Sequence, residues 1–457
     1  MTTIADTGLN ALRARFGAAL SGRLPAHIKR LQWDAERLQQ HQRERLRALL
    51  THAVERSPFH ARRLHGIDPE RFELEQLAEL PVMSKEQMMA SFDELLTDRR
   101  LTRSRAERHL AASTDEPSLL YDDYVCLASG GSSGLRGLFV QTVEEYVEFS
   151  ASLLRRLMAK VFAAGGPPPN GFPVGLIGAA APVHSSGFAA AVASGYPLRA
   201  ISVPATLSIG ELAQRLNDTQ PPVLLAHTSK LVMLAGEQRA GRLRISPVGI
   251  TAMAEQVSDE DRMAITEGFG VPPITQFTST EGLIGHSQPG GAVVSFACDN
   301  CIAELVDADN RPVSDGVPSD KVLVTNLHNF TQPLIRYELT DRFVRDPAGS
   351  DRGHLRATVE GRADDVFRYG DIAVDPLVIR SVMVRTPVAR EYQVRQSDRG
   401  IEIAVVADGV LDHAALASAL QRSLEVAGLS EPRVRVSEVA DIARHPETGK
   451  ARRFIPL

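Results

Sequence analysis

The chain has 457 residues, which is too long for one ordinary domain and predicts two or three. Hydrophobic residues make up 43% and charged residues 23%, and a formal net charge of -5 with both signs scattered along the chain disfavours a nucleic-acid-binding surface. The 3 Cys make a disulfide framework implausible and fit a reducing compartment.

Neither the N-terminus nor the most apolar stretch suggests a membrane or secretory protein. The N-terminus shows no apolar core of signal-peptide length. The most apolar stretch, residues 174–198, is interrupted by Pro, His, Ser and several Gly, which is not typical of a membrane span. We therefore expect a cytoplasmic protein.

The expected elements change in character along the chain. Residues 1–60 carry apolar residues at helical spacing with charges between them, which predicts helices. From about Tyr121, short β-rich runs alternate with helical segments, which predicts an α/β sheet packed on both faces. In this region we expect a helix over 144–162 and strands over 121–129, 137–142, 173–180, 199–205, 221–227 and 247–251.

A second change comes near residue 360. Before it, residues 321–327 and 332–344 are typical of strands. After it, a compact α+β pattern runs to the C-terminus, and this segment is long enough to form a small domain. We therefore predict a large α/β domain over 1–361 and a small α+β domain over 362–457, with a hinge at the polar junction.

A run of small residues follows the first expected strand: Ser129, Gly130, Gly131, Ser132, Ser133 and Gly134. Small residues let main-chain N–H groups close around a phosphate, and the hydroxyls add donors. The run also fits the G-x-S-x-G nucleophile elbow of serine hydrolases, which needs a helix directly after it. A strand is expected there instead, so the context favours a phosphate loop over a hydrolase.

Three further segments could carry chemistry. In the first, Phe277 precedes Thr280-Glu281, where a carboxylate beside a hydroxyl could hold Mg²⁺ and a phosphate oxygen, although the pair alone could be a capped helix start. In the second, Asp341 stands at an expected strand end, where it could accept ribose hydroxyls. In the third, Lys450 lies in a Gly turn near the C-terminus, where it could place a point charge on a phosphate or simply be solvated.

In this order, the motifs resemble the adenylate-forming superfamily of acyl-CoA ligases, adenylation domains and luciferases. The sequence is most similar to phenylacetate-CoA ligases and their relatives, in a segment that begins SPFHARRL at Ser57 and in the run Ile335-Arg336-Tyr337 to Asp341. The match extends from about residue 50 to the end. The resemblance implies a large α/β domain that binds ATP and an acid, and a mobile C-terminal α+β lid.

The resemblance assigns roles in nucleotide binding. It places the run 129–134 on the phosphates of ATP. Ala254 and Glu255 match the adenine loop of the family, Phe277 would stack on adenine, and Asp341 would take the ribose hydroxyls.

It also assigns roles in the chemistry. Thr280 would bind phosphate and Glu281 would hold the metal, Mg²⁺. Arg362 would lie near the ribose, Asp364 would be the hinge, and Lys450 would bridge the substrate carboxylate and the α-phosphate.

Three more residues are implied for the other substrates. Gly370 would line the tunnel for CoA, and His184 and His227 occupy places that line the acyl pocket in the family. The implied acid is an aryl or arylacetic acid.

The sequence departs from the family in three places. The phosphate loop normally ends in Pro and Lys, whereas Leu135-Arg136-Gly137 stand here, so the loop Lys is missing. Phe277 replaces the usual Tyr, and Met253 and Gln256 depart from the adenine-loop pattern. Because Glu281, Asp341, Arg362 and Lys450 are all present, an inactive copy is disfavoured.

Several alternatives stay open. The acyl-AMP could pass to CoA, or to an amine, a carrier-protein thiol or another nucleophile. A nucleotide sensor, a homodimer, and a zinc site at Cys298 and Cys301 are the remaining alternatives, and zinc would need two more ligands. No nucleic-acid or membrane partner is expected.

Overall fold

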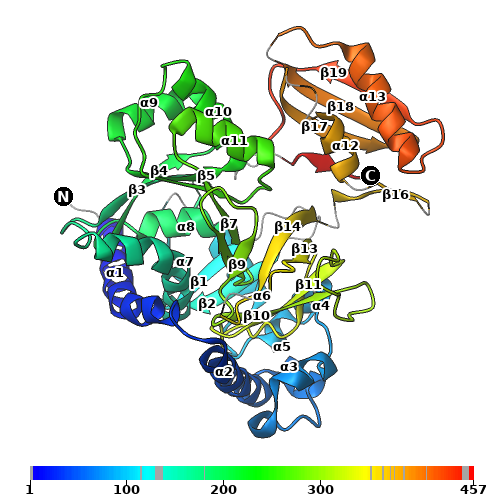
Figure 1. The fold of residues 1–457 in the computed structure, drawn as a ribbon. Helices are drawn as coiled ribbons and strands as arrows, with labels where there is room; N and C mark the ends of the chain where they lie inside the picture. Colours follow the sequence, from blue (N-terminus) through cyan, green and yellow to red (C-terminus); the bar gives the residue numbers. More distant parts are fainter. Residues whose placement is uncertain are drawn as a thin grey trace.

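The molecule was analysed as a computed structural model of residues 1–457. The structure describes residues 4–113, 116–128, 137–179, 181–349, 352–362, 365–370, 372–374, 376–383, 386, 388–407, 409–444 and 452–457. Figure 1 shows a large N-terminal part and a smaller C-terminal part beside it. None of the described helices is long and apolar enough to cross a membrane.

A nine-stranded sheet organises the large part. Its parallel half holds five strands, and its other half is antiparallel. In spatial order the strands are β13 (Asp341–Arg345), β14 (Arg356–Arg362), β9 (Val294–Phe296), β8 (Ile284–Ser287), β7 (Ile274–Thr278), β6 (Gly249–Met253), β5 (Val223–His227), β3 (Phe172–Gly178) and β4 (Leu198–Pro204).

Helices cover both faces of this sheet (Figure 1), as the alternating pattern predicts. Val223 packs into one core and its neighbour Leu224 into the other, because successive strand residues point to opposite faces. One face carries α9 (Ile209–Thr219), α10 (Thr228–Arg239) and α11 (Asp259–Phe269), and the other carries α1 (Ile4–Arg30), α7 (Val143–Ala163) and α8 (Ser185–Val192).

A second layer of the large part joins N-terminal helices to a three-stranded sheet through two cores, the larger of which also includes residues of β9, β13 and β14. The three-stranded sheet has the order β10-β11-β12, and the paired strands β1 and β2 pack on the larger core. The elements are α2 (Ala35–Arg56), α3 (Pro58–Arg63), η1 (Pro69–Arg71), η2 (Leu74–Glu79), α4 (Lys85–Ala90), α5 (Phe92–Leu95), α6 (Arg103–Ala111), β1 (Tyr124–Ala128), β2 (Leu138–Thr142), β10 (Cys301–Val306), β11 (Lys321–Asn326) and β12 (Tyr337–Leu339).

The small part has its own sheet and its own core. The sheet order is β19-β18-β17-β20, and the last strand runs parallel to β17. The elements are β15 (Phe367–Tyr369), β16 (Ile372–Val374), α12 (Pro376–Met383), β17 (Ala389–Ser397), β18 (Gly400–Ala407), α13 (His413–Val426), β19 (Arg433–Glu438) and β20 (Phe454–Ile455). The α/β class with a C-terminal α+β unit is therefore confirmed.

Two local expectations were wrong. Residues 332–344 form not one strand but two, since β12 pairs in the three-stranded sheet and β13 in the nine-stranded sheet. Asp341 therefore opens a strand rather than ending one. The alternative interpretation of Thr280-Glu281 as a capped helix start, which was not the predicted role of the pair, is excluded, because the pair lies in the turn between β7 and β8.

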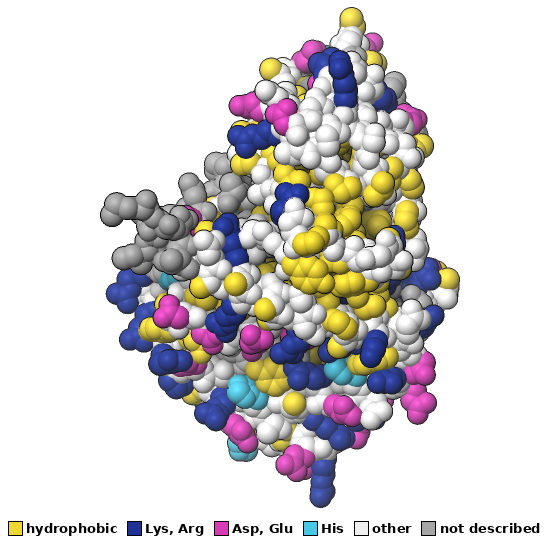
Figure 2. Space-filling view, turned by 90° about the vertical axis from the view of Figure 1, so that its left-hand side faces the viewer, with side chains coloured by type: hydrophobic (Ala, Val, Ile, Leu, Met, Phe, Trp, Pro, Cys, Tyr) yellow, Lys and Arg dark blue, Asp and Glu magenta, His cyan; other side chains and the backbone are white. Residues whose placement is uncertain are grey.

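One face of the large part is rich in apolar side chains. Figure 2 looks onto the left-hand side of Figure 1 and shows hydrophobic side chains gathered in the middle of this face. Strand β4 is last in the sheet and, among the described strands, pairs only with β3.

Candidate active site

The candidate site lies where the parallel strands end. The chain moves from β3 outward to β4 and then returns to β5 on the other side of β3, so the strand order reverses between β3 and β5. In open α/β sheets, ligands bind outside the carboxyl ends of the strands at such a reversal. The topology therefore points to the loops that follow β3 and β5.

The two predicted acid-pocket residues occupy these loops. His227 is the last residue of β5 and is 1% exposed. His184 follows β3 and stands at the N-cap of α8, where it is 6% exposed. Both side chains are thus buried at the point where the strand order reverses, which suits the wall of a substrate pocket.

The predicted adenine segment follows β6, the next strand in the sheet. Ala254 has a φ of +64°, a left-handed conformation that costs a non-glycine residue about 1–2 kcal/mol. Such strain persists only where the surrounding contacts fix the backbone, and it is common at functional sites. The carboxylate of Glu255 supplies such contacts, because it accepts hydrogen bonds from the Ser229 backbone N–H (2.8 Å) and hydroxyl (3.1 Å).

Gln256, which departs from the family pattern, forms hydrogen bonds to the backbone of β14. Its side-chain amide donates to the carbonyls of Val359 (3.3 Å) and Glu360 (3.1 Å) on β14. These bonds bring the adenine segment to the end of β14. In the register of β13 and β14, residue 362 lies directly opposite Asp341, which is 9% exposed. Asp341, the predicted ribose residue, is thus paired across the two strands with Arg362, its predicted neighbour.

The predicted metal and phosphate residues lie in the tight turn between β7 and β8. The Ser279 hydroxyl accepts a hydrogen bond from the Leu283 N–H (3.2 Å), and Asn326 donates to the Glu281 carbonyl (2.8 Å). Gly282 has a φ of +109°, and a Cβ there would lie 2.3 Å from Asn326 Nδ2. The turn is therefore held rigidly from behind, and Glu281 is 8% exposed.

Phe277 is half-buried beside this turn. Its ring meets Phe343 edge-to-face at 5.1 Å and Phe296 at 5.8 Å between centroids. Such contacts fix the orientation of an aromatic ring. Stacking of adenine on Phe277 stays a prediction.

Several predicted residues lie outside the described part of the chain. They are Ser129, Gly130, Gly131, Ser132, Ser133, Gly134, Asp364 and Lys450, and the side chain of Arg362 is not described either. The flanks of the glycine run are described, and β1 and β2 pair around it with Ala128 opposite Leu138. The element after the run is a strand, as expected, and not the helix that a nucleophile elbow requires.

The small part contacts the large part close to this site. The Arg444 guanidinium donates to the Ser229 hydroxyl (3.0 Å) and also bonds Glu391 of β17. Burial lowers the pKa of Lys230, the next residue of α10, and the positive charge of Arg444 lowers it further. The sequence did not single out Arg444 and Ser229, and the only available signal was that Arg444 lies six residues before Lys450.

Comparison with known proteins agrees with this architecture. No family model matches the chain. A phenylacetate-coenzyme A ligase of Thermus thermophilus is 26% identical over 416 residues, which cover 83% of this chain and 81% of the relative.

Solved structures of 2-hydroxyisobutyryl-CoA ligase show the same fold. In the postadenylation state in complex with 2-HIB-AMP, the TM-score is 0.69 at 18% identity, with 94% of this chain and 91% of that chain covered. The chain has the fold of the adenylate-forming CoA ligases. The same ligase in its thioesterification state, with 2-HIB-AMP and CoA, gives a TM-score of 0.53 at 18% identity, with 92% and 90% covered.

Gly370 lies on the small part. It directly follows β15 with a φ of +61°, and a Cβ there would meet no described residue within 4 Å. In the described conformation, the position is open.

The three cysteines of the chain are buried, and none of them forms a disulfide. The Leu355 N–H donates to Cys298 Sγ (3.2 Å), and Cys301 Sγ donates to the Gly282 carbonyl (3.1 Å). Within the described residues, no group of three or more His, Cys, Asp or Glu could hold a metal ion. Cys301 thus packs behind the β7–β8 turn, whereas Cys298 bonds the segment that precedes β14.

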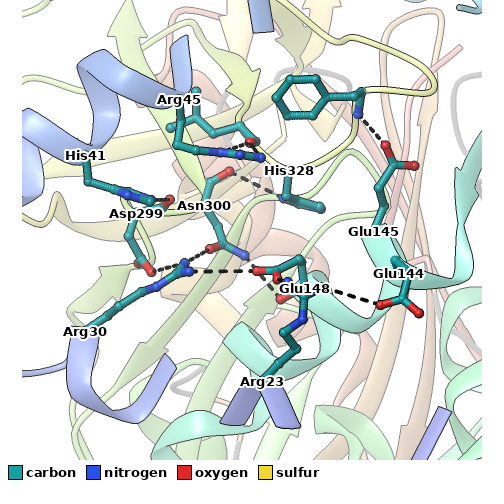
Figure 3. Close-up of a pocket in the computed structure, with 12 residues that line it drawn as sticks. Arg23, Arg30, His41, Arg45, Glu144, Glu145, Glu148, Asp299, Asn300 and His328 are labelled. Carbon is teal, nitrogen blue, oxygen red and sulfur yellow. Dashed lines mark hydrogen bonds and ion pairs between the residues drawn. The ribbon is translucent and has the colours of Figure 1, made fainter. Parts of the chain in front are cut away.

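A separate cavity of about 420 Å³ opens between α1, α2 and α7 (Figure 3). Its charged residues bond to one another, as Arg30 does to Asp299 (3.4 Å). Burial alone would raise the pKa of Asp299, but the guanidinium of Arg155, at 2.6 and 2.7 Å, holds it well below its usual range. These ion pairs anchor α1 and α7 to the residues that follow β9.

Proposed function

We propose that the chain is an ATP-dependent, AMP-forming acid-CoA ligase. Its substrate would be a small carboxylic acid, of the aryl or arylacetic class. Two observations support the proposal. Strands β5, β6 and β7 are neighbours in the sheet, so that His227, Glu255 and Glu281 stand at or after the ends of adjacent strands. Gln256 bonds β14, whose partner strand β13 begins with Asp341. The likeness to a phenylacetate-coenzyme A ligase supports the class of acid.

In the first half-reaction, a carboxylate oxygen attacks the α-phosphorus of ATP, and pyrophosphate leaves. Asp341 would hold the ribose and Glu255 the adenine segment, while Thr280 would contact phosphate. Mg²⁺, when bound at Glu281, would neutralise phosphate charge. The buried position of Glu281 in a rigid turn fits one metal ligand. Lys450 would bring a positive charge to the meeting point of carboxylate and α-phosphate.

In the second half-reaction, the thiol of CoA attacks the acyl carbonyl, and AMP leaves with the bonding electron pair. The lid would turn about Asp364, so that Lys450 moves away and Gly370 approaches the thiol. The second candidate product arises from the same acyl-AMP with an amine or a carrier-protein thiol as nucleophile. A homodimer stays a prediction.

The test is acid-dependent pyrophosphate release across a panel that includes phenylacetate, benzoate and 2-hydroxyisobutyrate, each with and without CoA. We expect release with at least one aryl or arylacetic acid and a thioester when CoA is present. Lys450→Ala should lower release by roughly 10²–10³-fold, and it should spare transfer from pre-made acyl-AMP. Absence of release with every acid would refute the proposal, and release without thioester would shift it to the second candidate.

A further inference from the structure

The two ends of the predicted catalytic loop are fastened to one residue of the small sheet. The Gln393 side-chain amide donates to the carbonyls of Ala443 (3.4 Å) and Arg452 (2.9 Å). Gln393 lies in β17, and the next residue, Val394, pairs with Phe454 of β20. The chain on either side of residues 445–451 therefore has a fixed position on the lid.

Arg444 connects this fixed position to the large part. Its side chain is 12% exposed, and that of its partner Glu391 is 7% exposed, so the ion pair is largely removed from water. The other arm of the guanidinium reaches Ser229 across the domain boundary, and the Met233 sulfur lies 3.7 Å from Nη2. A buried guanidinium with two directed partners sets an orientation more strictly than a surface pair does.

Ser229 passes this contact on to the adenine segment. Its hydroxyl accepts from Arg444 and donates to Glu255, and its backbone N–H donates to the same carboxylate. One continuous chain of polar contacts thus runs from Glu391 on the lid, through Arg444 and Ser229, to Glu255. Arg444 therefore links the segment that would hold adenine to the lid that carries Lys450.

The lid lies in a particular pose when this link is made. The chain as a whole superposes better on 2-hydroxyisobutyryl-CoA ligase in the postadenylation state, with a TM-score of 0.69, than on the same ligase in the thioesterification state, with a TM-score of 0.53. A rotation of the lid away from α10 would break the bond between Arg444 and Ser229, because Glu391 would move with Arg444.

We propose that Arg444 is a positioning residue that holds the lid in the adenylating pose through Ser229, and that this bond breaks before the acyl group is transferred. The half-reactions named here rest on the proposed function. The bond orients the root of the Lys450 loop and therefore acts on the first half-reaction only.

The first test measures domain arrangement and needs no substrate. The native cysteines are buried, so spin labels can be placed at Met263→Cys on α11, 57% exposed, and Val426→Cys on α13, 90% exposed. We expect one dominant distance in the parent protein without ligands. Arg444→Ala should broaden the distribution, and Arg444→Lys should do so less, since the charge remains but the two-armed geometry is lost.

The matched control is Arg435→Ala, which removes the exposed ion pair with Glu402 (2.8 Å) elsewhere on the lid. It should leave the distances unchanged. Unchanged distances in Arg444→Ala would overturn the proposal. Should that variant fail to fold, Ser229→Ala and Arg444→Lys carry the same test, because each removes or weakens the bond across the boundary.

The second test separates the half-reactions. Arg444→Ala should lower acid-dependent pyrophosphate release by roughly 10–100-fold, the scale of a catalytic group misplaced by about 1 Å. Transfer from pre-made acyl-AMP should stay within about twofold of the parent rate. Equal losses in both steps would overturn the proposal. If the parent releases no pyrophosphate with any acid, the proposed function fails, while the distance measurement still decides whether Arg444 holds the lid.

Discussion

At the scale of single residues, the β7–β8 turn depends on a glycine. Gly282 combines a φ of +109° with close contact to Asn326. Gly282→Ala should therefore lower the free energy of unfolding by about 2–4 kcal/mol, since a strained backbone and a displaced buried amide add up. Urea denaturation measures this. The matched control is Gly241→Ala, where φ is +71° and nothing lies within 4 Å, so that only the backbone cost remains.

A second residue-scale prediction concerns the ribose. Asp341→Ala should weaken ATP binding by about 1.5–3 kcal/mol for each lost charge-assisted hydrogen bond and should leave acid preference unchanged. Isothermal calorimetry measures the nucleotide affinity. Asp309→Ala, on an exposed turn, serves as the control for loss of one negative charge. Equal affinity in the parent and in Asp341→Ala would remove Asp341 from the site.

At the scale of elements, the β15–β16 hairpin distinguishes the two steps. Gly370→Leu should be tolerated in the described pose, because no described residue would meet the new Cβ within 4 Å. The remaining cost is that of a left-handed backbone at a residue with a side chain. It should spare acyl-AMP formation and stop thioester formation, because a side chain would obstruct the CoA arm once the lid has turned. Pyrophosphate and thioester are assayed in parallel. Normal thioester formation by the variant would show that this hairpin does not line the CoA path.

At the scale of the whole molecule, buried histidines make stability depend on pH. Burial lowers the pKa of His60 to about 3 and that of His328 to about 4. Well above pH 6.5 these imidazoles are neutral in the folded and in the unfolded protein, so they do not lower the free energy of unfolding. As the pH falls below 6.5, the unfolded chain binds protons that the folded chain does not, so stability is lost, by about 4 kcal/mol for the two histidines at pH 5.

The measurement compares urea denaturation at pH 7.5 and pH 5. In His60→Gln, whose amide can still donate to the Pro333 carbonyl as His60 does (2.9 Å), the loss between the two pH values should be about 2 kcal/mol smaller than in the parent protein. His65→Gln changes an exposed histidine a short way along the same chain segment and should keep the parent's pH dependence. Parallel pH profiles for the parent and His60→Gln would contradict this account.

The sequence by itself determined most elements of the fold and the class of chemistry. Alternating and helical periodicities predicted β3, β5 and α7, because local patterns of apolar residues decide which faces are buried. The order of the motifs indicated adenylation before any contact was known. These signals are local, so they are readable without the fold.

Only the tertiary structure decided how the elements meet. It divided residues 332–344 between two sheets, and it placed the loops after β3 and β5 at the reversal of strand order. It also joined Arg444 to Ser229, which lie 215 residues apart in the sequence. No local pattern encodes such a contact, because its partners are brought together by strand order and domain docking, and each residue alone resembles an ordinary polar surface residue.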